Sequence, residues 1–187
     1  KIMGHSFFLG IDMSKKSFDF CLLDGEGTIL NEGKVANERA EIREWAEVLG
    51  DDFGSGFWGS CLVCMEHSGY YGAHLLGVLG SEVGADIWLE NALRIKRSLG
   101  LQRGKSDRVD AARIAAYCLD KQRVARLWAP TPANIERLGL LLSHRDRMVK
   151  NLMSLRNSLN EEEGYVEDAL HVEMAEVSAP AMAAMEA

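Results

Sequence analysis

The sequence predicts an α/β fold, in which helices flank a mixed sheet and a long helix follows. Three strand-like segments, at 7–12, 18–23 and 28–35, stand in close succession, which predicts an antiparallel start to the sheet. Helix-like and strand-like patterns then alternate as far as residue 89. Three antiparallel strands followed by alternating helices and strands match the ribonuclease-H-like fold.

The individual elements follow from local signals. The first strand is an apolar run, and the second and third strands are joined through Asp24-Gly25, which opens a hairpin turn. A helix is predicted over 38–49, because four apolar residues recur on one face: Ile42, Trp45, Ala46 and Leu49. The glycine-rich stretch 50–59 predicts a loop. Beyond it, the pattern predicts a strand over 61–66, a helix over 72–79 and a strand over 85–89.

The character of the chain changes after Pro130 and Pro132. A three/four spacing of apolar residues predicts a long amphipathic helix over 131–163 with a coiled-coil tendency: Leu138, Leu141, Met148, Leu152, Leu155 and Leu159. This helix either pairs with a second subunit, giving a homo-oligomer, or packs back on its own domain. Residues 164–187 form either a poorly ordered tail or a short extra helix. The expected organisation is therefore a sheet domain over 1–130, the long helix and the tail.

Two acidic residues end predicted strands. Asp12 closes the apolar run 7–12, and Glu66 closes the apolar run 61–66. Both runs are typical of buried strands, and open α/β sheets place their chemistry at the carboxyl ends of such strands. Glu is moreover a poor strand former and is costly to bury without a partner, so Glu66 favours a functional role. For Asp12 the structural alternative is a turn or cap residue.

Two further acids open a predicted helix. Ser106 is a fair N-cap, and Asp107 and Asp110 share a stripe with Ile114 and Cys118 at spacings of three and four. That stripe is expected to face protein. The structural alternatives are that Asp107 complements the helix dipole and that Asp110 pairs with Arg113 in solvent.

A metal site is the common explanation for these four residues. Clustered carboxylates repel one another, so a hard divalent cation compensates them. The layout predicts a metal-dependent nuclease or strand-transfer centre with Mg²⁺ or Mn²⁺ held by four ligands: Asp12, Glu66, Asp107 and Asp110. Zinc does not fit, because no Cys/His set has suitable spacing and Cys61 and Cys64 point to opposite faces of a strand.

Charge is unevenly distributed along the chain. The segment 94–126 contains ten Lys/Arg and three Asp, a net charge of +7, whereas the whole chain carries −7. Phosphates attracted to this segment would lie beside the proposed metals, which predicts nucleic-acid contacts by four residues: Arg97, Arg103, Lys105 and Arg108. The alternative is a solvated basic surface.

Three motifs occur in order between residues 7 and 128: GIDMSKKSFDF, MEHSGYYGAHLLGVL and GKSDRVDAARIAAY. Together they resemble the N-terminal DEDD domain of the bridge-RNA-guided insertion-sequence recombinases, a transposase family that is also similar to the pilin-gene invertases. The run Lys105-Ser106-Asp107 with Asp110-Ala111 is the more specific part of the resemblance.

The resemblance implies a RuvC-like domain, similar to Holliday-junction resolvases, whose divalent metal ligands by motif position are Asp12, Glu66, Asp107 and Asp110. It also implies DNA as a partner, together with a guide RNA. Family members carry a further domain with a serine that attacks DNA, and Ser154, Ser158 and Ser178 lack a matching context. The expectation is therefore a transposase/recombinase catalytic domain for insertion-sequence transposition, in a truncated chain that does not complete strand exchange alone.

Two other functions fit the same residues. A stand-alone Holliday-junction resolvase-like nuclease would use the same carboxylates with water as nucleophile, and metal-dependent nicking would favour it. A non-catalytic fragment would only bind nucleic acid or a partner chain, and binding indifferent to metal would favour that. An actin-like ATPase or sugar kinase needs a second lobe and glycine-rich phosphate loops, which do not occur in this sequence.

Composition sets the remaining bounds. At 187 residues and 47% hydrophobic content, the chain is long enough for one core plus an appendage. No apolar run reaches the length of a membrane span, and no signal peptide precedes the first strand, so a cytoplasmic protein is expected. The cysteines are expected to be small core residues, which agrees with a reducing compartment.

Overall fold

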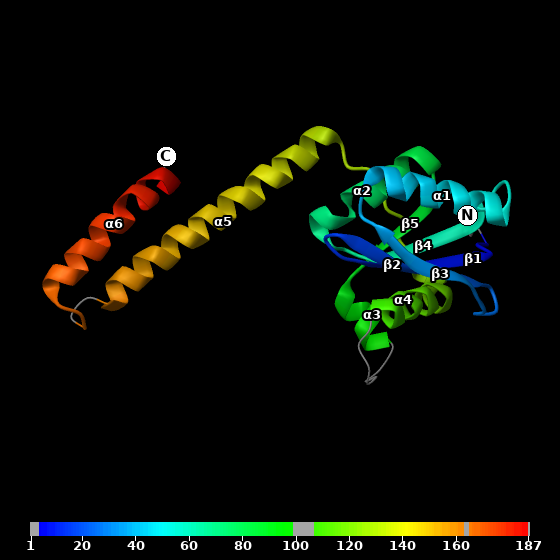
Figure 1. Cartoon of the computed structure of the whole chain (residues 1–187), viewed down its shortest axis with the longest axis horizontal. Coiled ribbons are helices and arrows are strands. Elements are labelled where there is room, and N and C mark those ends of the chain that lie inside the picture. Colours follow the sequence, from blue (N-terminus) through cyan, green and yellow to red (C-terminus); the bar gives the residue numbers. More distant parts are fainter. Residues whose placement is uncertain (1–3, 99–106, 163–164, 187) are drawn as a thin grey trace. The chain divides into compact units, whose positions relative to one another are not determined.

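The structure, a computed structural model, describes residues 4–98, 107–162 and 165–186, without the side chains at 107, 108 and 186. It divides into two compact units, Lys1–Pro130 and Thr131–Ala187. The first unit contains the sheet, and the second is a pair of helices (Figure 1).

A five-stranded mixed sheet forms the centre of the first unit. Its strands lie in the order β3-β2-β1-β4-β5, with β1 antiparallel to β2, β2 antiparallel to β3, and β4 and β5 parallel to β1. The bounds are β1 (Phe7–Met13), β2 (Ser17–Asp24), β3 (Ile29–Ala36), β4 (Cys61–Glu66) and β5 (Asp86–Glu90). The predicted ribonuclease-H-like fold is confirmed. Asp24 makes the predicted hairpin turn, because its Oδ1 accepts hydrogen bonds from the backbone N–H groups of Glu26 (2.9 Å) and Thr28 (2.8 Å).

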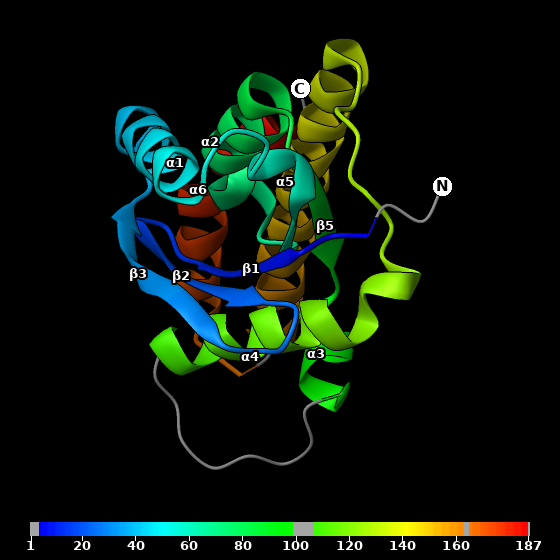
Figure 2. The same ribbon diagram turned by 90° about the vertical axis from the view of Figure 1, so that its right-hand side faces the viewer.

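Helices cover both faces of the sheet (Figure 2). One face carries α1 (Arg39–Phe53) and the segment from η2 (Gly69–Gly72) through α2 (Ala73–Leu75) to η3 (Leu76–Val83). The other face carries α3 (Ala92–Ser98) and α4 (Asp107–Lys121). Two short 3₁₀ turns complete the unit, η1 (Trp58–Ser60) and η4 (Gln122–Val124).

The helix predicted over 72–79 is a composite of three helix types. A 3₁₀ turn precedes one turn of α-helix, and η3 continues as a π-helix that Gly84 ends in the left-handed conformation (φ 78°). Glycine is a poor helix former, and the Trp128 ring packs directly against Gly80, where an added Cβ would collide with Cζ3 of the ring. A regular α-helical periodicity cannot describe such a segment.

The alternation of side chains along the strands builds two cores. Leu9 and Ile11 belong to the core under α1, whereas Phe8 belongs to the core under α4. Cys61 and Cys64 are divided between the two cores in the same way, so the prediction that they point to opposite faces is confirmed. All four cysteines lie in the described residues, are buried and form no disulfide. Burial raises the pKa of the Cys61 and Cys118 thiols, so both stay protonated and act as small apolar residues.

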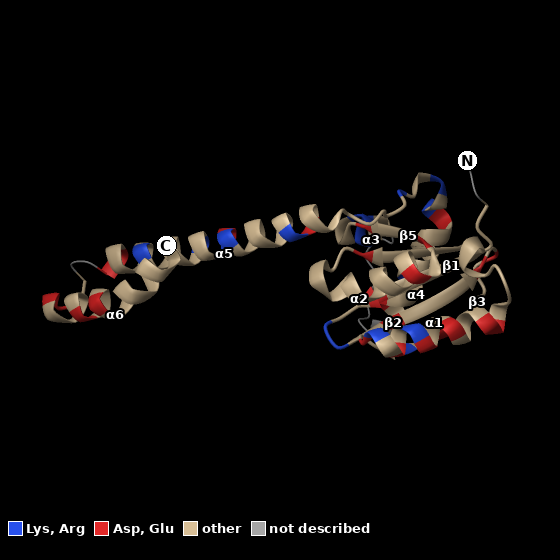
Figure 3. Cartoon of the chain, turned by 90° about the horizontal axis from the view of Figure 1, so that it is seen from above, with Lys and Arg blue, Asp and Glu red and all other residues tan. Residues whose placement is uncertain are grey.

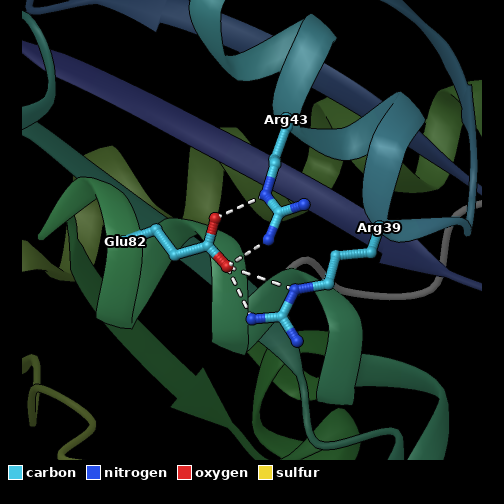
Figure 4. A network of polar contacts seen from close by, with 3 residues as sticks. All are labelled: Arg39, Arg43 and Glu82. Carbon is cyan, nitrogen blue, oxygen red and sulfur yellow. Dashed lines mark hydrogen bonds and ion pairs between the residues drawn. The ribbon is translucent and has the colours of Figure 1, made fainter.

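An ion-pair cluster fastens α1 to η3. The Glu82 carboxylate accepts hydrogen bonds from Arg43 (Nε to Oε2, 2.6 Å) and from Arg39 (Nε to Oε1, 3.1 Å), as Figure 4 shows. These bonds, with that of Arg43 first, lower the pKa of Glu82 to about 2. The carboxylate therefore remains charged in the folded protein at pH values where it is protonated in the unfolded chain.

The stabilisation by Glu82 should depend on pH. A lowered folded-state pKa stabilises the protein above the ordinary Glu value, and this stabilisation is lost as the pH falls from about 4.5 towards 2. We expect Glu82→Gln to melt below the unmodified protein at pH 6 and to approach it at pH 3. Glu44→Gln, an exposed change on α1, is the control and should shift the melting temperature equally at both pH values. An unchanged gap for Glu82→Gln between pH 6 and pH 3 would argue against this account.

The second unit is a helical hairpin. The predicted long helix is observed as α5 (Ala133–Glu162). Residues 168–186, for which the sequence left a poorly ordered tail or a short extra helix open, form α6 (Asp168–Glu186), which turns back beside the later part of α5 (Figure 1). His171 Nε2 lies 2.9 Å from the carbonyl oxygen of Leu159 and joins the two helices.

Candidate functional site

The sheet register places Asp12 and Glu66 next to each other. Gly10 pairs with Cys64, and Ile11 pairs with Met65, in the parallel ladder between β1 and β4. Continuing by one residue brings Asp12 level with Glu66, on strands that are about 4.8 Å apart. Both side chains are partly buried. Gly10 and Cys64, which lie two residues before Asp12 and Glu66, both face α4. Because side chains alternate along a strand, the two carboxylates belong to the same face of the sheet.

Helix α4 runs directly over this face. Gly10 has no side chain, and a Cβ there would collide with the backbone carbonyl of Ala111 and the backbone N of Ala115. Further along α4, the Cys118 thiol donates to the carbonyl oxygen of Leu62, at the opposite end of the strands (3.5 Å). The helix is therefore antiparallel to β1, and its first turns lie at the Asp12 end of the sheet (Figure 2).

Asp110 reaches this end of the sheet from α4. Ile114 and Cys118, on its stripe, are buried as predicted, whereas the Asp110 side chain is 43% exposed. Its Oδ1 accepts a hydrogen bond from Nη1 of Arg113 at 2.8 Å, which is the ion pair anticipated from the sequence. Asp107 begins α4, but its side chain lies outside the described residues.

A further carboxylate, that of Glu90, was not predicted. Glu90 pairs with Glu66 across the parallel ladder between β4 and β5 and shares its face. It is only 6% exposed. Its Oε2 accepts from the Tyr117 hydroxyl (3.0 Å) and its Oε1 from the backbone N of Asn91 (2.7 Å), while Arg94 lies 3.9 Å away. The sequence contains a signal for it, since Glu90 directly follows the apolar segment 85–89, much as Glu66 closes the apolar run 61–66.

The contacts of Glu90 connect three elements at this end of the sheet. It joins α4 through Tyr117 and α3 through Asn91 and Arg94, and its carbonyl accepts from the N–H of His67, the residue after Glu66 (3.1 Å). Burial and the adjacent carboxylate raise the pKa of Tyr117 to about 12, so the phenol keeps the proton that it donates. Glu90 thus fixes the surroundings of Glu66 and the position of α4.

Replacing Glu90 should test this role. We expect Glu90→Ala to lower the free energy of unfolding by about 1–3 kcal/mol, because the buried Tyr117 hydroxyl and the Asn91 N–H are then left without an acceptor. Glu90→Gln keeps an acceptor oxygen and should cost less. Urea denaturation measures both variants, and Glu44→Ala is the matched exposed control. Equal stability of Glu90→Ala and the unmodified protein would contradict the assignment.

The donor chemistry at the end of the sheet fits a hard cation. Asp12, Glu66 and Asp110 offer carboxylate oxygens, which Mg²⁺ and Mn²⁺ prefer, whereas the protonated buried thiols do not suit zinc. Within residues 4–98, 107–162 and 165–186, no three His, Cys, Asp or Glu side chains lie close enough together to hold a metal ion. The four-ligand site therefore stays a prediction, and one of its members, Asp107, has no described side chain.

The basic segment is described only in part. Arg97 is exposed on α3, where Figure 3 shows a concentration of Lys and Arg. Arg103 and Lys105 lie outside the described residues, as does the side chain of Arg108. No helix of the described chain is long and apolar enough to cross a membrane.

Comparisons with known proteins identify a family. The model of the IS110-type DEDD transposases, described as "Transposase", matches residues 9–161. No curated protein matches. Among solved structures, T. thermophilus RuvC in complex with a Holliday junction substrate is 16% identical, with a TM-score of 0.49 over 66% of this chain and 100% of that chain. A Thermus thermophilus RuvC structure is 17% identical, with a TM-score of 0.45 over 65% of this chain and 99% of that chain.

Proposed function

Because the chain belongs to the IS110-type DEDD transposase family, we propose that its sheet unit performs divalent-metal-assisted phosphoryl transfer on DNA during insertion-sequence transposition. The observation that carries the proposal is the placing of Asp12 beside Glu66 on the face over which the acidic first turns of α4 lie. Three segments distant in sequence supply carboxylates to one end of the sheet.

The carboxylates would act as ligands. Asp12, Glu66, Asp107 and Asp110 would hold Mg²⁺ or Mn²⁺, and Asp110 would have to exchange its contact with Arg113 for the ion. The bound ions would stabilise charge on a scissile phosphate and orient the attacking group. Glu90 is engaged by Tyr117 and Asn91, so it would position the ligand-bearing elements and would not bind the ions itself.

Metal titration tests the proposal directly. Calorimetric titration of Mn²⁺ into the purified chain should show one or two ions bound, with affinity retained in 0.15 M salt. Asp51→Asn with Asp52→Asn, an exposed acidic pair in α1, should leave this binding unchanged. Loss of binding in the Asp51/Asp52 variant, or no saturable binding by the unmodified chain, would overturn the proposal.

The proposed partners are DNA and a guide RNA, with α5 as a contact between copies of the chain. Arg97, Arg103, Lys105 and Arg108 would contact phosphates near the carboxylates. We expect the triple variant Arg97→Ala, Arg103→Ala, Lys105→Ala to weaken DNA binding and to reduce the salt slope by about 2–3, roughly 0.9 for each phosphate that is no longer neutralised. Fluorescence anisotropy at several salt concentrations measures this.

The matched control removes three basic residues from the other unit, at Arg137, Arg145 and Lys150. An unchanged affinity and salt slope in the first triple variant would assign the basic segment to a solvated surface. A slope change confined to the control would place the DNA contact on α5.

A resolvase-like nuclease is the second candidate. It would use the same candidate ligands, all of which lie in the sheet unit, with water as the nucleophile. Metal-dependent nicking of a DNA junction by the purified chain would support this function over strand transfer.

A further inference from the structure

Two exposed tyrosines follow Glu66 after the short turn 67–69. Tyr70 and Tyr71 lie in η2, and their side chains are 56% and 47% exposed. Gly69, in the left-handed conformation (φ 60°), makes the turn that leads from β4 into them. Two neighbouring exposed tyrosines offer ring faces and hydroxyl groups to another molecule.

Two exposed lysines come shortly after Asp12, as the tyrosines come shortly after Glu66. Lys15 and Lys16 are exposed in the turn between β1 and β2. The turn is held by Ser14, whose backbone N and hydroxyl both donate to the carbonyl oxygen of Ser17 (2.9 and 2.6 Å). In Figure 3 this basic turn lies beside α2, the helix that continues from the tyrosines.

Asn37 joins the lysine turn to the tyrosines. Its side-chain Nδ2 lies within hydrogen-bond distance of the Tyr71 carbonyl oxygen (2.9 Å) and of the Ser14 and Lys15 carbonyl oxygens (3.4 Å each). Its backbone N donates to the carbonyl oxygen of Lys16 (2.9 Å). Asn37 therefore holds the lysine turn and the backbone of Tyr71 together, at the end of the sheet where the strands that carry Asp12 and Glu66 finish.

We infer that Lys15, Lys16, Tyr70 and Tyr71 form a platform for unpaired nucleotides at the end of the sheet where the carboxylates lie. Lysine ammonium groups neutralise phosphates, and tyrosine rings stack on base faces. A base offers its face only when it is unstacked, so the platform selects single-stranded or distorted DNA over regular duplex. The inference rests on the proposed function, for which it supplies a means of holding the strand beside the metal ligands.

Oligonucleotide binding without divalent metal separates this inference from the metal site. Anisotropy with a single strand and with a duplex of the same sequence would be measured in EDTA. We expect Tyr70→Ala and Tyr71→Ala together to weaken single-strand binding at least about fivefold, the lower end for removal of one stacked base, with little effect on the duplex. Tyr70→Phe and Tyr71→Phe should retain affinity, because they retain the rings. Tyr165→Ala, a 90% exposed tyrosine in the other unit, is the matched control.

The lysines have a different expected signature. Lys15→Ala with Lys16→Ala should reduce the salt slope for single strands by about 1.4, roughly 0.7 for each phosphate that is no longer neutralised. Unchanged single-strand affinity in the Tyr70/Tyr71 alanine variant, or an equal loss in Tyr165→Ala, would overturn the inference. An equal loss in the phenylalanine variants would also overturn it, because it would assign the effect to the hydroxyl groups. Failure of the platform leaves Mn²⁺ binding intact, whereas failure of the metal site leaves this EDTA measurement unchanged.

Discussion

Asp12→Asn is expected to lower metal-dependent DNA cleavage or strand transfer by on the order of 100-fold or more, with the fold intact. Asn is nearly isosteric with Asp but lacks the charge that holds a divalent ion. Asp12 is partly buried beside Glu66, so removing its charge also relieves repulsion in the metal-free protein. The melting temperature in EDTA should therefore be unchanged or slightly raised, while Mn²⁺ affinity falls.

Asp120→Asn is the matched control for this variant. Asp120 lies on α4, is 71% exposed, and pairs with Lys121, remote from the strand ends. It removes the same charge and should leave Mn²⁺ affinity and cleavage unchanged. A marked loss of thermal stability of Asp12→Asn in metal-free buffer would instead give Asp12 a structural role in the turn after β1.

Gly10→Ala is expected to lower the free energy of unfolding by about 3 kcal/mol, the upper end for overpacking of a core. The added methyl group would meet backbone atoms of Ala111 and Ala115, which cannot move aside as a flexible side chain can. Displacement of α4 would also move Asp110 away from Asp12, so Mn²⁺ affinity should fall with stability. Urea denaturation and calorimetry measure the two effects.

Gly59→Ala provides the comparison, because a Cβ at Gly59 meets nothing within 4 Å and its backbone conformation suits any residue. It should leave stability and Mn²⁺ affinity close to those of the unmodified protein. If Gly10→Ala unfolds at the same urea concentration as Gly59→Ala, the close approach of α4 to β1 does not control the fold.

Local sequence signals predicted most of the sheet unit, because strand ends and turns depend on neighbouring residues. The strand over 61–66 was predicted with its observed bounds, and Asp24-Gly25 correctly marked the hairpin. A helix was predicted over 72–79, but not its composite form over 69–83, in which Gly80 packs against the ring of Trp128, far along the chain. Long-range packing of this kind leaves no trace in a local periodicity.

The positions of Asp12 and Glu66 at strand ends could be predicted from the sequence, but the contacts of these residues could not. Sequence order indicated that Asp12 and Glu66 end strands, but only the parallel register shows that they are level with each other. The role of Glu90 depends on a hydrogen bond from the hydroxyl of Tyr117, which lies 27 residues further along the chain. The contact between Asp110 and Arg113 is local, at a spacing of three on one helix, and was therefore anticipated as an alternative.

Strand β1 lies at the centre of the sheet, and this position determines how slowly its amide protons exchange with solvent. This strand is paired along both edges and packed on both faces, so its amide protons should exchange with solvent only when the whole sheet unit unfolds. Asp12 directly follows the residues paired on both edges, Phe7 to Ile11, and lies two residues before an exposed turn. The strands are held in register for as long as the protein is folded. When an ion or a DNA strand binds near Asp12 and Glu66, the carboxylates must therefore adjust through side-chain rotation and through movement of α4.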